Sequence, residues 1–245
     1  MTLPATGRLY GIGLGPGDPE LLTVKAVRLI QAAPIVAFFA KAGRRGNARG
    51  IVDRWLPEKC EELPLYYPVT TEIAFDDPCY AGLLAAFYQA SAERVAAHLA
   101  AGRDVALLSE GDPLFYGSFM HLFVRLKGRF PVTVVPGVTA LSGCLAAAST
   151  PGAWGDDVLT FLPGTLPLAA LVARLSGCDA AAIMKIGRNL AKVRAALARA
   201  GLIERAIYVE RATMADEVIV PLMEKADDEA PYFAMVIVPG IGRRP

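Results

Sequence analysis

Apolar residues fall into short runs separated by stretches with helical spacing, a pattern that predicts an α/β protein. In the first part of the chain the short runs are typical of buried strands in a parallel sheet. The predicted strands cover residues 9–14, 34–39, 61–65, 105–108 and 132–135. The predicted helices cover residues 19–31, 80–101, 116–126 and 141–148. Because strands and helices alternate here, we expect a mostly parallel five-stranded sheet.

The second part of the chain has strands that follow each other more closely, which favours a mixed sheet. The predicted strands cover residues 158–162, 180–186, 206–210, 217–221 and 232–238, and the predicted helices cover 168–175 and 188–199. Thr150-Pro151-Gly152 is the strongest break in the pattern. We therefore expect an N-terminal α/β domain at 1–150 and a C-terminal α/β domain at 151–245.

A glycine-rich turn follows the first predicted strand, where residues 9–23 read LYGIGLGPGDPELLT. Asp18 suits the N-cap of the next helix, Pro19 suits its first position, and Glu20 complements the positive end of the helix dipole. The stretch is not a dinucleotide fingerprint, because Pro16 and Asp18 stand where G-x-G-x-x-G requires glycine. It also lacks the Lys-Ser/Thr ending of a P-loop. An acidic turn favours a small uncharged or cationic ligand, and an ordinary tight turn is the alternative.

Two further strand ends carry glycine and proline. Residues 105–119 read VALLSEGDPLFYGSF and residues 132–140 read VTVVPGVTA. In an open parallel sheet, ligands bind beyond the carboxyl ends of the strands. The three loops together therefore predict a ligand site at that edge of the sheet.

In order and spacing, these three motifs resemble those of the tetrapyrrole methylase superfamily, which uses S-adenosylmethionine. IMKIGR at 183–188 and VERAT at 209–213 extend the resemblance to nearly the whole chain. It implies that fold, with the active site in the cleft between two α/β domains. LPLYYPVTTE at 63–72 and LFYGSFMHLF at 114–123 resemble the branch that methylates the meso carbon 20 of precorrin-2 to give precorrin-3A. The branch acting on cobalt-precorrin-2 shares these stretches, and a sibling acting at another ring carbon stays open.

The resemblance implies a binding site for S-adenosylmethionine, with S-adenosylhomocysteine as product. The residues implied to line it are Pro16, Gly111, Asp112, Thr139, Ala140, Ile186, Ala212 and Pro239. Asp112 would accept a hydrogen bond from the donor, or it would only cap the segment after Pro113. The transfer needs alignment of two partners, exclusion of water and removal of one proton, so we expect no metal. For the proton acceptor we leave Asp112, Glu110, Tyr116 and water open.

The tetrapyrrole substrate of this family carries carboxylates, for which arginine and lysine are the natural partners. The candidates for this contact are Lys41, Arg44, Arg45, Arg49 and Lys185, with Arg188 as a further cation. A solvated basic surface is the alternative for the segment from 41 to 54. Tyr66, Tyr67 and Tyr116 are candidates for contacts with the macrocycle, or they serve packing alone.

Composition limits the partners and the cellular compartment that we expect for this protein. A net charge of +1 argues against a nucleic-acid partner. The four cysteines are far apart, which indicates buried thiols in a reducing compartment, and the two histidines fall in predicted helices, where we expect structural roles. Residues 132–148, the longest apolar stretch, contain Pro136 and Thr139 and do not predict a membrane span. We expect a cytoplasmic homodimer, as in the family, and a non-catalytic sensor of S-adenosylmethionine is the alternative from another class.

Overall fold

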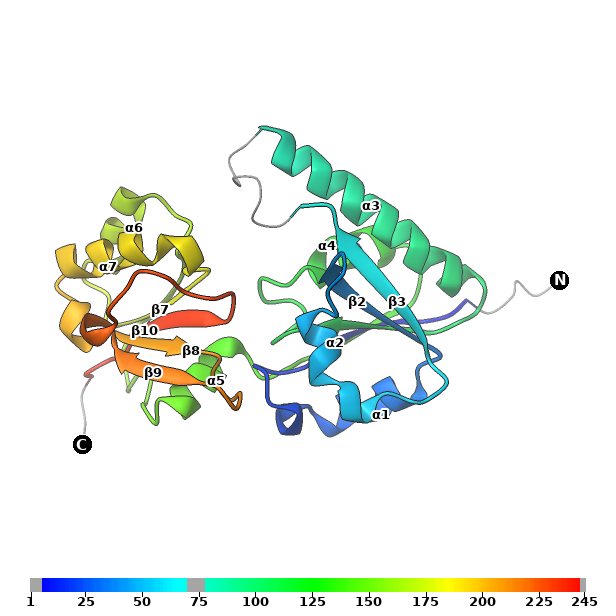
Figure 1. Ribbon diagram of the computed structural model, residues 1–245, viewed down its shortest axis with the longest axis horizontal. Helices are drawn as coiled ribbons and strands as arrows, with labels where there is room; N and C mark the ends of the chain where they lie inside the picture. Colours follow the sequence, from blue (N-terminus) through cyan, green and yellow to red (C-terminus); the bar gives the residue numbers. More distant parts are fainter. Residues whose placement is uncertain (1–5, 70–77, 243–245) are drawn as a thin grey trace. The chain divides into compact units, whose positions relative to one another are not determined.

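The computed structural model describes residues 6–69 and 78–242. The chain divides into two compact units, Met1–Thr139 and Ala140–Pro245. Each unit contains its own five-stranded sheet, and each is described by itself (Figure 1).

The first unit is built on a parallel sheet, as the sequence predicts. Its strand order is β3-β2-β4-β1-β5, and every pair of neighbours runs parallel. The strands are β1 (Leu9–Gly13), β2 (Ile35–Lys41), β3 (Glu61–Tyr67), β4 (Val105–Ser109) and β5 (Val132–Val135). Their carboxyl ends therefore all meet at one edge, the edge where the predicted ligand loops begin.

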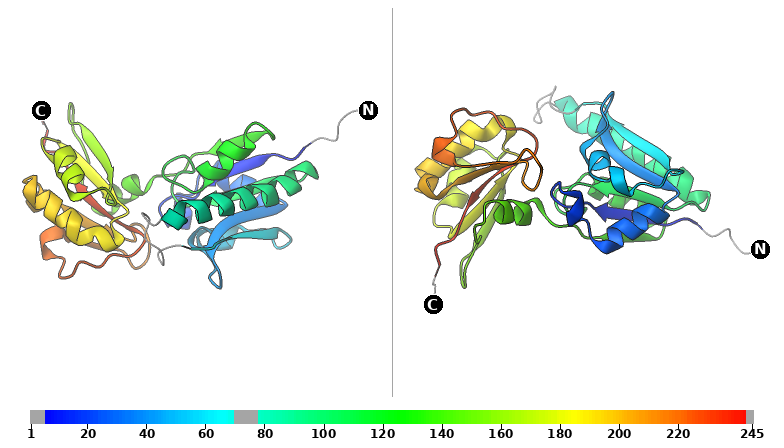
Figure 2. Two further views of the ribbon diagram at one scale, coloured as in Figure 1. Left: turned by 90° about the horizontal axis from the view of Figure 1, so that it is seen from above. Right: turned by 60° about the horizontal axis from the view of Figure 1, so that its bottom comes forward.

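Helices cover both faces of this sheet (Figure 1). Alternate residues of the strands point to opposite faces: Ile35 packs with the helices of one side, and Val36 packs with those of the other. The first face carries α3 (Pro78–Ala100) and α4 (Phe119–Leu126), which lie side by side (Figure 2). The second carries α1 (Val24–Ala32) and α2 (Asn47–Ile51), followed by the single turn η2 (Asp53–Trp55).

Two predicted helices are shorter than the apolar spacing suggests. The helix expected at 19–31 is split into a single turn, η1 (Pro19–Leu21), and α1. The Thr23 hydroxyl accepts from the Ala26 N–H at 3.1 Å and starts a new helix, while Asp18 caps η1 through the Glu20 N–H at 2.7 Å. The helix expected at 116–126 begins only at Phe119. Tyr116 has a φ of 58°, which a right-handed helix excludes.

The second unit has the mixed sheet that the sequence predicts, in the order β6-β7-β10-β8-β9. Its strands are β6 (Leu159–Pro163), β7 (Ala180–Met184), β8 (Ile207–Glu210), β9 (Val218–Pro221) and β10 (Ala234–Val238). β6 and β7 are parallel, β10 runs antiparallel to both β7 and β8, and β8 runs antiparallel to β9. α6 (Leu168–Leu175) and α7 (Leu190–Arg199) cover one face, and α5 (Ala140–Ala147) covers the other (Figure 1).

The division between the units falls before α5, whereas the sequence suggested a boundary at residue 150. Cys144 of α5 packs with Ala182, Val209 and Met235 of the second sheet, so the helix belongs to the second unit. This burial raises the pKa of the Cys144 thiol to about 12. The expectation of buried thiols is wrong for Cys79, which is exposed.

The strand predicted at 61–65 continues through Tyr66 and Tyr67 as β3. Residues 70–77 lie outside the described residues. No helix in residues 6–69 and 78–242 combines the length and the apolar character that a membrane crossing requires.

Candidate functional site

The strand order of the first unit brings the three glycine-rich loops together. β1 lies between β4 and β5, so the loops that follow these strands are neighbours at the carboxyl edge. β2 pairs with β4 on its other side, and β3 completes the row. The predicted donor loops and the predicted acceptor segment after β2 therefore occupy adjacent parts of one edge, as expected for a ligand site in an open parallel sheet.

The glycines allow these loops to pack backbone against backbone. Gly15 and Gly111 exchange two hydrogen bonds, with N···O distances of 3.3 and 2.8 Å. A Cβ atom at Gly137 would lie 2.1 Å from the Gly111 oxygen, and one at Gly13 would lie 2.4 Å from the Gly137 nitrogen. Glycine is thus required at 13 and 137 for contact between the loops.

Asp112 joins two of the three loops through its carboxylate. Oδ1 accepts from the Leu114 N–H at 2.9 Å, and Oδ2 accepts from the Gly137 N–H at 3.1 Å. The first bond caps the turn after Pro113, the alternative role that the sequence left open for Asp112. This turn precedes α4 and is not part of it. The second bond ties the loop after β4 to the loop after β5. Each carboxylate oxygen has two lone pairs, so Asp112 retains acceptor capacity for a ligand.

Glu110 connects the donor loops to the segment after β2. Its Oε1 accepts from the Ala48 N–H at 3.2 Å, in the first turn of α2. Burial raises the pKa of the Glu110 carboxyl, and the N–H groups of Ala48 and of Glu110 itself oppose the shift only in part. The surroundings of Glu110 therefore favour the protonated form of its carboxyl.

The basic segment is less available for a ligand than the sequence suggests. Arg45 and Arg49 both pair with Asp53, and Arg49 also bonds to Glu62 with an N···O distance of 2.6 Å. The hydrogen bond from Arg49 lowers the pKa of the Glu62 carboxyl. Lys41 and Arg44 are exposed, while the Arg49 side chain is only 12% exposed.

The three candidate tyrosines have different surroundings. Tyr67 packs on Phe39 and Phe87, with ring centroids 5.5 and 4.8 Å away, as the packing alternative describes. Tyr66 is 48% exposed and Tyr116 is 41% exposed. Tyr116 also holds the left-handed backbone conformation that is costly for a side chain of its size.

In the second unit the direction of the strands separates residues that the resemblance grouped. Ile186 and Ala212 follow β7 and β8, which run the same way, so both lie at one edge. Pro239 follows β10, which runs the opposite way and ends at the opposite edge. There the Pro239 oxygen accepts from Nη1 of Arg205 at 3.0 Å. The structure therefore places Pro239 at the edge opposite Ile186 and Ala212.

The segment that does reach the edge of Ile186 and Ala212 is the one before β10. The Arg211 N–H donates to the Phe233 oxygen at 2.7 Å, and Tyr232, which is 78% exposed, packs edge-on against the Phe233 ring. Sequence reasoning missed Tyr232, because only the antiparallel direction of β10 reveals its place. Lys185, Arg211 and Thr213 near this edge have φ values of 54°, 49° and 69°. Such strain in residues with side chains is typical of functional loops.

Buried side chains limit what the second unit offers directly. Ile186 is fully buried in the apolar core under α6 and α7, and Ala212 is 7% exposed against the core of the other face. Both residues would meet a ligand mainly through the backbone. Thr139 and Ala140 stand on either side of the division between the units, and Lys185 is exposed.

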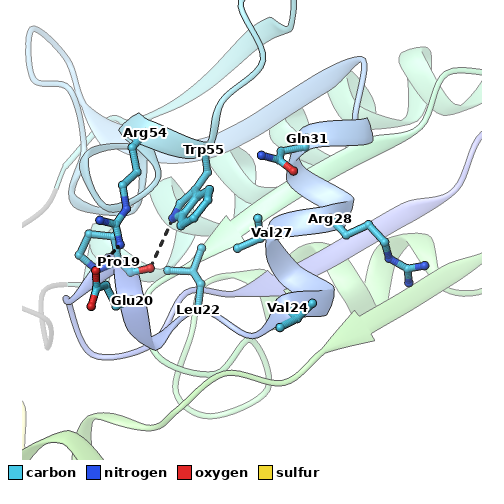
Figure 3. A pocket seen from close by; sticks show the side chains of 9 residues that line it. All are labelled: Pro19, Glu20, Leu22, Val24, Val27, Arg28, Gln31, Arg54 and Trp55. Atoms are coloured by element: carbon cyan, nitrogen blue, oxygen red, sulfur yellow. Dashed lines mark hydrogen bonds and ion pairs between the residues drawn. The ribbon is translucent and has the colours of Figure 1, made fainter.

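A pocket of about 560 Å³ lies beside Trp55 in the first unit. Its lining comes from η1, α1 and η2, and the Trp55 indole N–H donates to the Pro19 oxygen across it at 3.4 Å (Figure 3). Pro16, Gly111 and Asp112 are not among the residues that line it. Within the part of the chain that the structure describes, no three histidine, cysteine or acidic side chains are placed to hold a metal ion.

The two histidines have contacts of the structural kind expected for them. His98 lies on α3 with Nε2 3.8 Å from a Glu61 oxygen. His121 lies on α4 and stacks on the ring of Tyr88, with centroids 4.0 Å apart.

Comparison with known proteins places these loops in a family context. Residues 8–227 match the model of the Tetrapyrrole (Corrin/Porphyrin) Methylases. The chain is 61% identical to a Precorrin-2 C(20)-methyltransferase of Sinorhizobium sp, over 98% of both chains. It is 30% identical to a Cobalt-precorrin-2 C(20)-methyltransferase of Salmonella typhimurium, over 95% of this chain and 96% of the relative. The crystal structure of Uroporphyrin-III C-methyl transferase from Thermus thermophilus, complexed with S-adenyl homocysteine, superposes with a TM-score of 0.67 at 25% identity, over 95% and 92% of the two chains.

Proposed function

This chain belongs to the tetrapyrrole methylases, and we propose that it transfers a methyl group from S-adenosylmethionine to carbon 20 of precorrin-2, giving precorrin-3A in cobalamin biosynthesis. The observation that carries the proposal is the full-length similarity to the Sinorhizobium methyltransferase. The meeting of three glycine-rich loops at one sheet edge supports it from the structure.

The donor site we propose uses the loops after β1, β4 and β5. These loops contain Asp18, Asp112 and several glycines, and carboxylates suit a donor with a cationic sulfonium and an ammonium group. Pro16, Gly111, Asp112 and Thr139 would contribute from the first unit. Ala140 and the backbone of Ile186 and Ala212 would contribute from the second, with Tyr232 replacing Pro239. The cleft between the domains remains part of this proposal.

S-adenosylmethionine, when bound, supplies an electrophilic methyl group. The protein's own part is to bind the ring, orient carbon 20, exclude water and receive one proton. Lys41, Arg44 and Lys185 are exposed cations that would pair with ring carboxylates, and Arg45 and Arg49 would do so only by sharing their acidic partners. Glu110 is the preferred proton acceptor, because its surroundings favour the protonated form. Asp112 and Tyr116 would hold the donor and the ring, respectively.

Three other expectations form part of the proposal. The two domains, which the sequence divides at residue 150 and the structure divides before α5, would share the site. The enzyme would act as a homodimer, and it would work in the cytoplasm. Cobalt-precorrin-2 is the second candidate substrate, favoured by the similarity to the Salmonella relative. A sensor that binds S-adenosylmethionine without turnover is the alternative outside enzymology.

The test is incubation of the purified protein with S-adenosylmethionine and anaerobic precorrin-2, with and without cobalt in the ring. We expect one added methyl group by mass, and carbon NMR with a labelled methyl should place it at carbon 20. Faster turnover of the cobalt form would move the assignment to the second candidate. Donor binding without a methylated product from either ring would contradict the proposed activity and support the sensor.

A further inference from the structure

The loop between Gly111 and Ser118 presents apolar side chains to solvent at a sheet edge. Leu114, Phe115 and Tyr116 are 46%, 41% and 41% exposed. Three consecutive large apolar residues at this exposure are unusual outside binding surfaces. We call these three residues the apolar ridge.

The ridge is held in place by a tight and strained backbone. The Phe115 N–H donates to the Asp112 oxygen at 3.2 Å, and Asp112 in turn bonds the Leu114 N–H. Tyr116 takes a φ of 58°, and a Cβ atom at Gly117 would lie 3.2 Å from the Pro113 oxygen. Such a conformation persists only where its surroundings determine it strongly.

The hydroxyl of Ser118 anchors the end of the ridge loop. Its Oγ shares hydrogen bonds with the Tyr67 hydroxyl at 2.5 Å and with the Tyr88 hydroxyl at 3.1 Å. Tyr67 ends β3, and Tyr88 is a buried residue of α3 whose ring stacks on His121 of α4. One hydroxyl therefore joins the end of the ridge loop to a strand and to a helix.

The use of this hydroxyl departs from its usual role. Ser118 directly precedes α4, and its backbone is already helical, with φ of −67° and ψ of −20°. A capping serine needs a non-helical backbone, so this hydroxyl makes no bond to the helix end. Its hydrogen bonds go to the two tyrosines instead.

We propose that Ser118 is a positioning residue, whose hydroxyl fixes the apolar ridge as the surface that meets the apolar face of the tetrapyrrole. This inference rests on the proposed function for the identity of the ligand. Tyr67 lies at the carboxyl end of β3, and Asp112 follows β4, so the ridge belongs to the edge that carries the donor loops. Ser118 acts on the ring only through the ridge, while Asp112 holds the donor side.

The first readout needs no substrate. Hydrogen exchange of the ridge backbone should accelerate about tenfold in Ser118→Ala, because the loop loses both hydrogen bonds of this hydroxyl. Tyr88→Phe should give a smaller acceleration, and Ser118→Thr, which keeps the hydroxyl, should restore the protection. Ser176→Ala is the matched control, since that hydroxyl donates to the Val172 oxygen of α6 in the second unit at 2.9 Å. Unchanged exchange in Ser118→Ala would overturn the proposal.

The second readout is kinetic. Ser118→Ala should raise the KM for the tetrapyrrole about tenfold, with the Kd for S-adenosylhomocysteine unchanged. A lower melting temperature with wild-type KM would show a merely structural serine and overturn the proposal. Equal losses of tetrapyrrole and donor binding would also overturn it. If the wild-type protein does not methylate precorrin-2, the proposed function fails, while the exchange experiment still decides the role of Ser118.

Discussion

The two sheets have five strands each, but they differ in how strand direction distributes their loops. In the first unit all strands are parallel, so each loop that follows a strand reaches the same edge. In the second unit β10 runs against β7 and β8, so the loop after it leaves from the opposite edge. Motif order along the chain therefore predicts the neighbours of a site in the first unit and misleads in the second.

The difference is clearest at Asp112 and Pro239. Asp112 follows a parallel strand, and its carboxylate reaches the loop after β5 at 3.1 Å, as a shared edge predicts. Pro239 also follows a strand, yet it contacts Arg205 at the far edge. The same sequence signal, a proline or glycine after an apolar run, thus has different spatial meaning in the two sheets.

The largest expected effect comes from forcing the loops of the first unit apart. Gly137→Ala would place a methyl group 2.1 Å from the Gly111 oxygen, and a backbone atom cannot move aside cheaply. We expect a loss of unfolding free energy on the order of 3 kcal/mol and loss of donor binding. Urea unfolding and calorimetric titration with S-adenosylhomocysteine would measure both. Gly128→Ala is the control, because a Cβ atom there meets nothing within 4 Å. Equal behaviour of the two variants would contradict the packing role.

The next largest effect is expected from Asp112, which links the loop after β4 to the loop after β5. Asp112→Ala leaves the N–H groups of Leu114 and Gly137 without their carboxylate, so donor affinity should fall by roughly tenfold to a hundredfold. Asp228→Ala, which removes a carboxylate from an exposed ion pair in the second unit, should leave affinity unchanged. Wild-type affinity in Asp112→Ala would reduce this residue to a turn cap.

A smaller effect is expected from the basic segment beside the donor loops. The double substitution Arg44→Ala with Arg45→Ala should raise the tetrapyrrole KM by roughly threefold to tenfold. Donor affinity should not change, and substitution of an exposed residue of α6, Arg174→Ala, should change neither quantity. Steady-state kinetics against both substrates would measure this split. Unaltered kinetics would contradict this role and support the alternative that residues 41–54 form a solvated basic surface.

The smallest expected effect on stability is the pH dependence set by Glu110. Burial raises the native pKa above the ordinary value of 4.5, so the native state binds this proton more tightly than the unfolded chain does. Stability is therefore lost as pH rises from 4.5 through the native pKa. Glu110→Gln should remove this loss and make the protein more stable near neutral pH, while kcat falls if Glu110 receives the proton.

Glu93 provides a control of opposite sign. Arg129 lowers the native pKa of Glu93 below 4.5, so the stability it contributes is present above that pH and is lost as pH falls through the native pKa. Glu93→Gln should weaken the protein near neutral pH. Unfolding in urea at about pH 4 and about pH 8 would compare the two variants. The same sign for both would contradict the assignment for Glu110.

Much of the fold follows from the sequence, because periodicity reports burial. The strand β5 and the helix α6 have the predicted bounds, and most other elements differ from prediction at their ends only. The failures have local causes. Thr23 restarts a helix that the apolar spacing predicted as continuous, and Tyr116 adopts a backbone conformation that residue type disfavours.

The parts of the site that depend on the order of elements along the chain were predictable. The parts that depend on ion pairs and hydrogen bonds between distant residues were not. The convergence of the donor loops followed from parallel strands. No local sequence pattern encodes the tertiary contacts of the site. Examples are the ion pairs of Arg45 and Arg49, the hydrogen bond from Ala48 to Glu110, and the position of Pro239 beside Arg205. The Ser118 hydroxyl was hidden for the same reason, since its partners lie on β3 and α3.

The most direct test is hydrogen exchange of the wild-type protein with and without S-adenosylhomocysteine. We predict protection of the loops after β1, β4 and β5 in the first unit, and of the loops after β7 and β8 with the segment before β10 in the second. Residues 239–242 should exchange at the same rate in both samples. Protection at 239–242, or confined to the lining of the cavity beside Trp55, would contradict the donor site described for this chain.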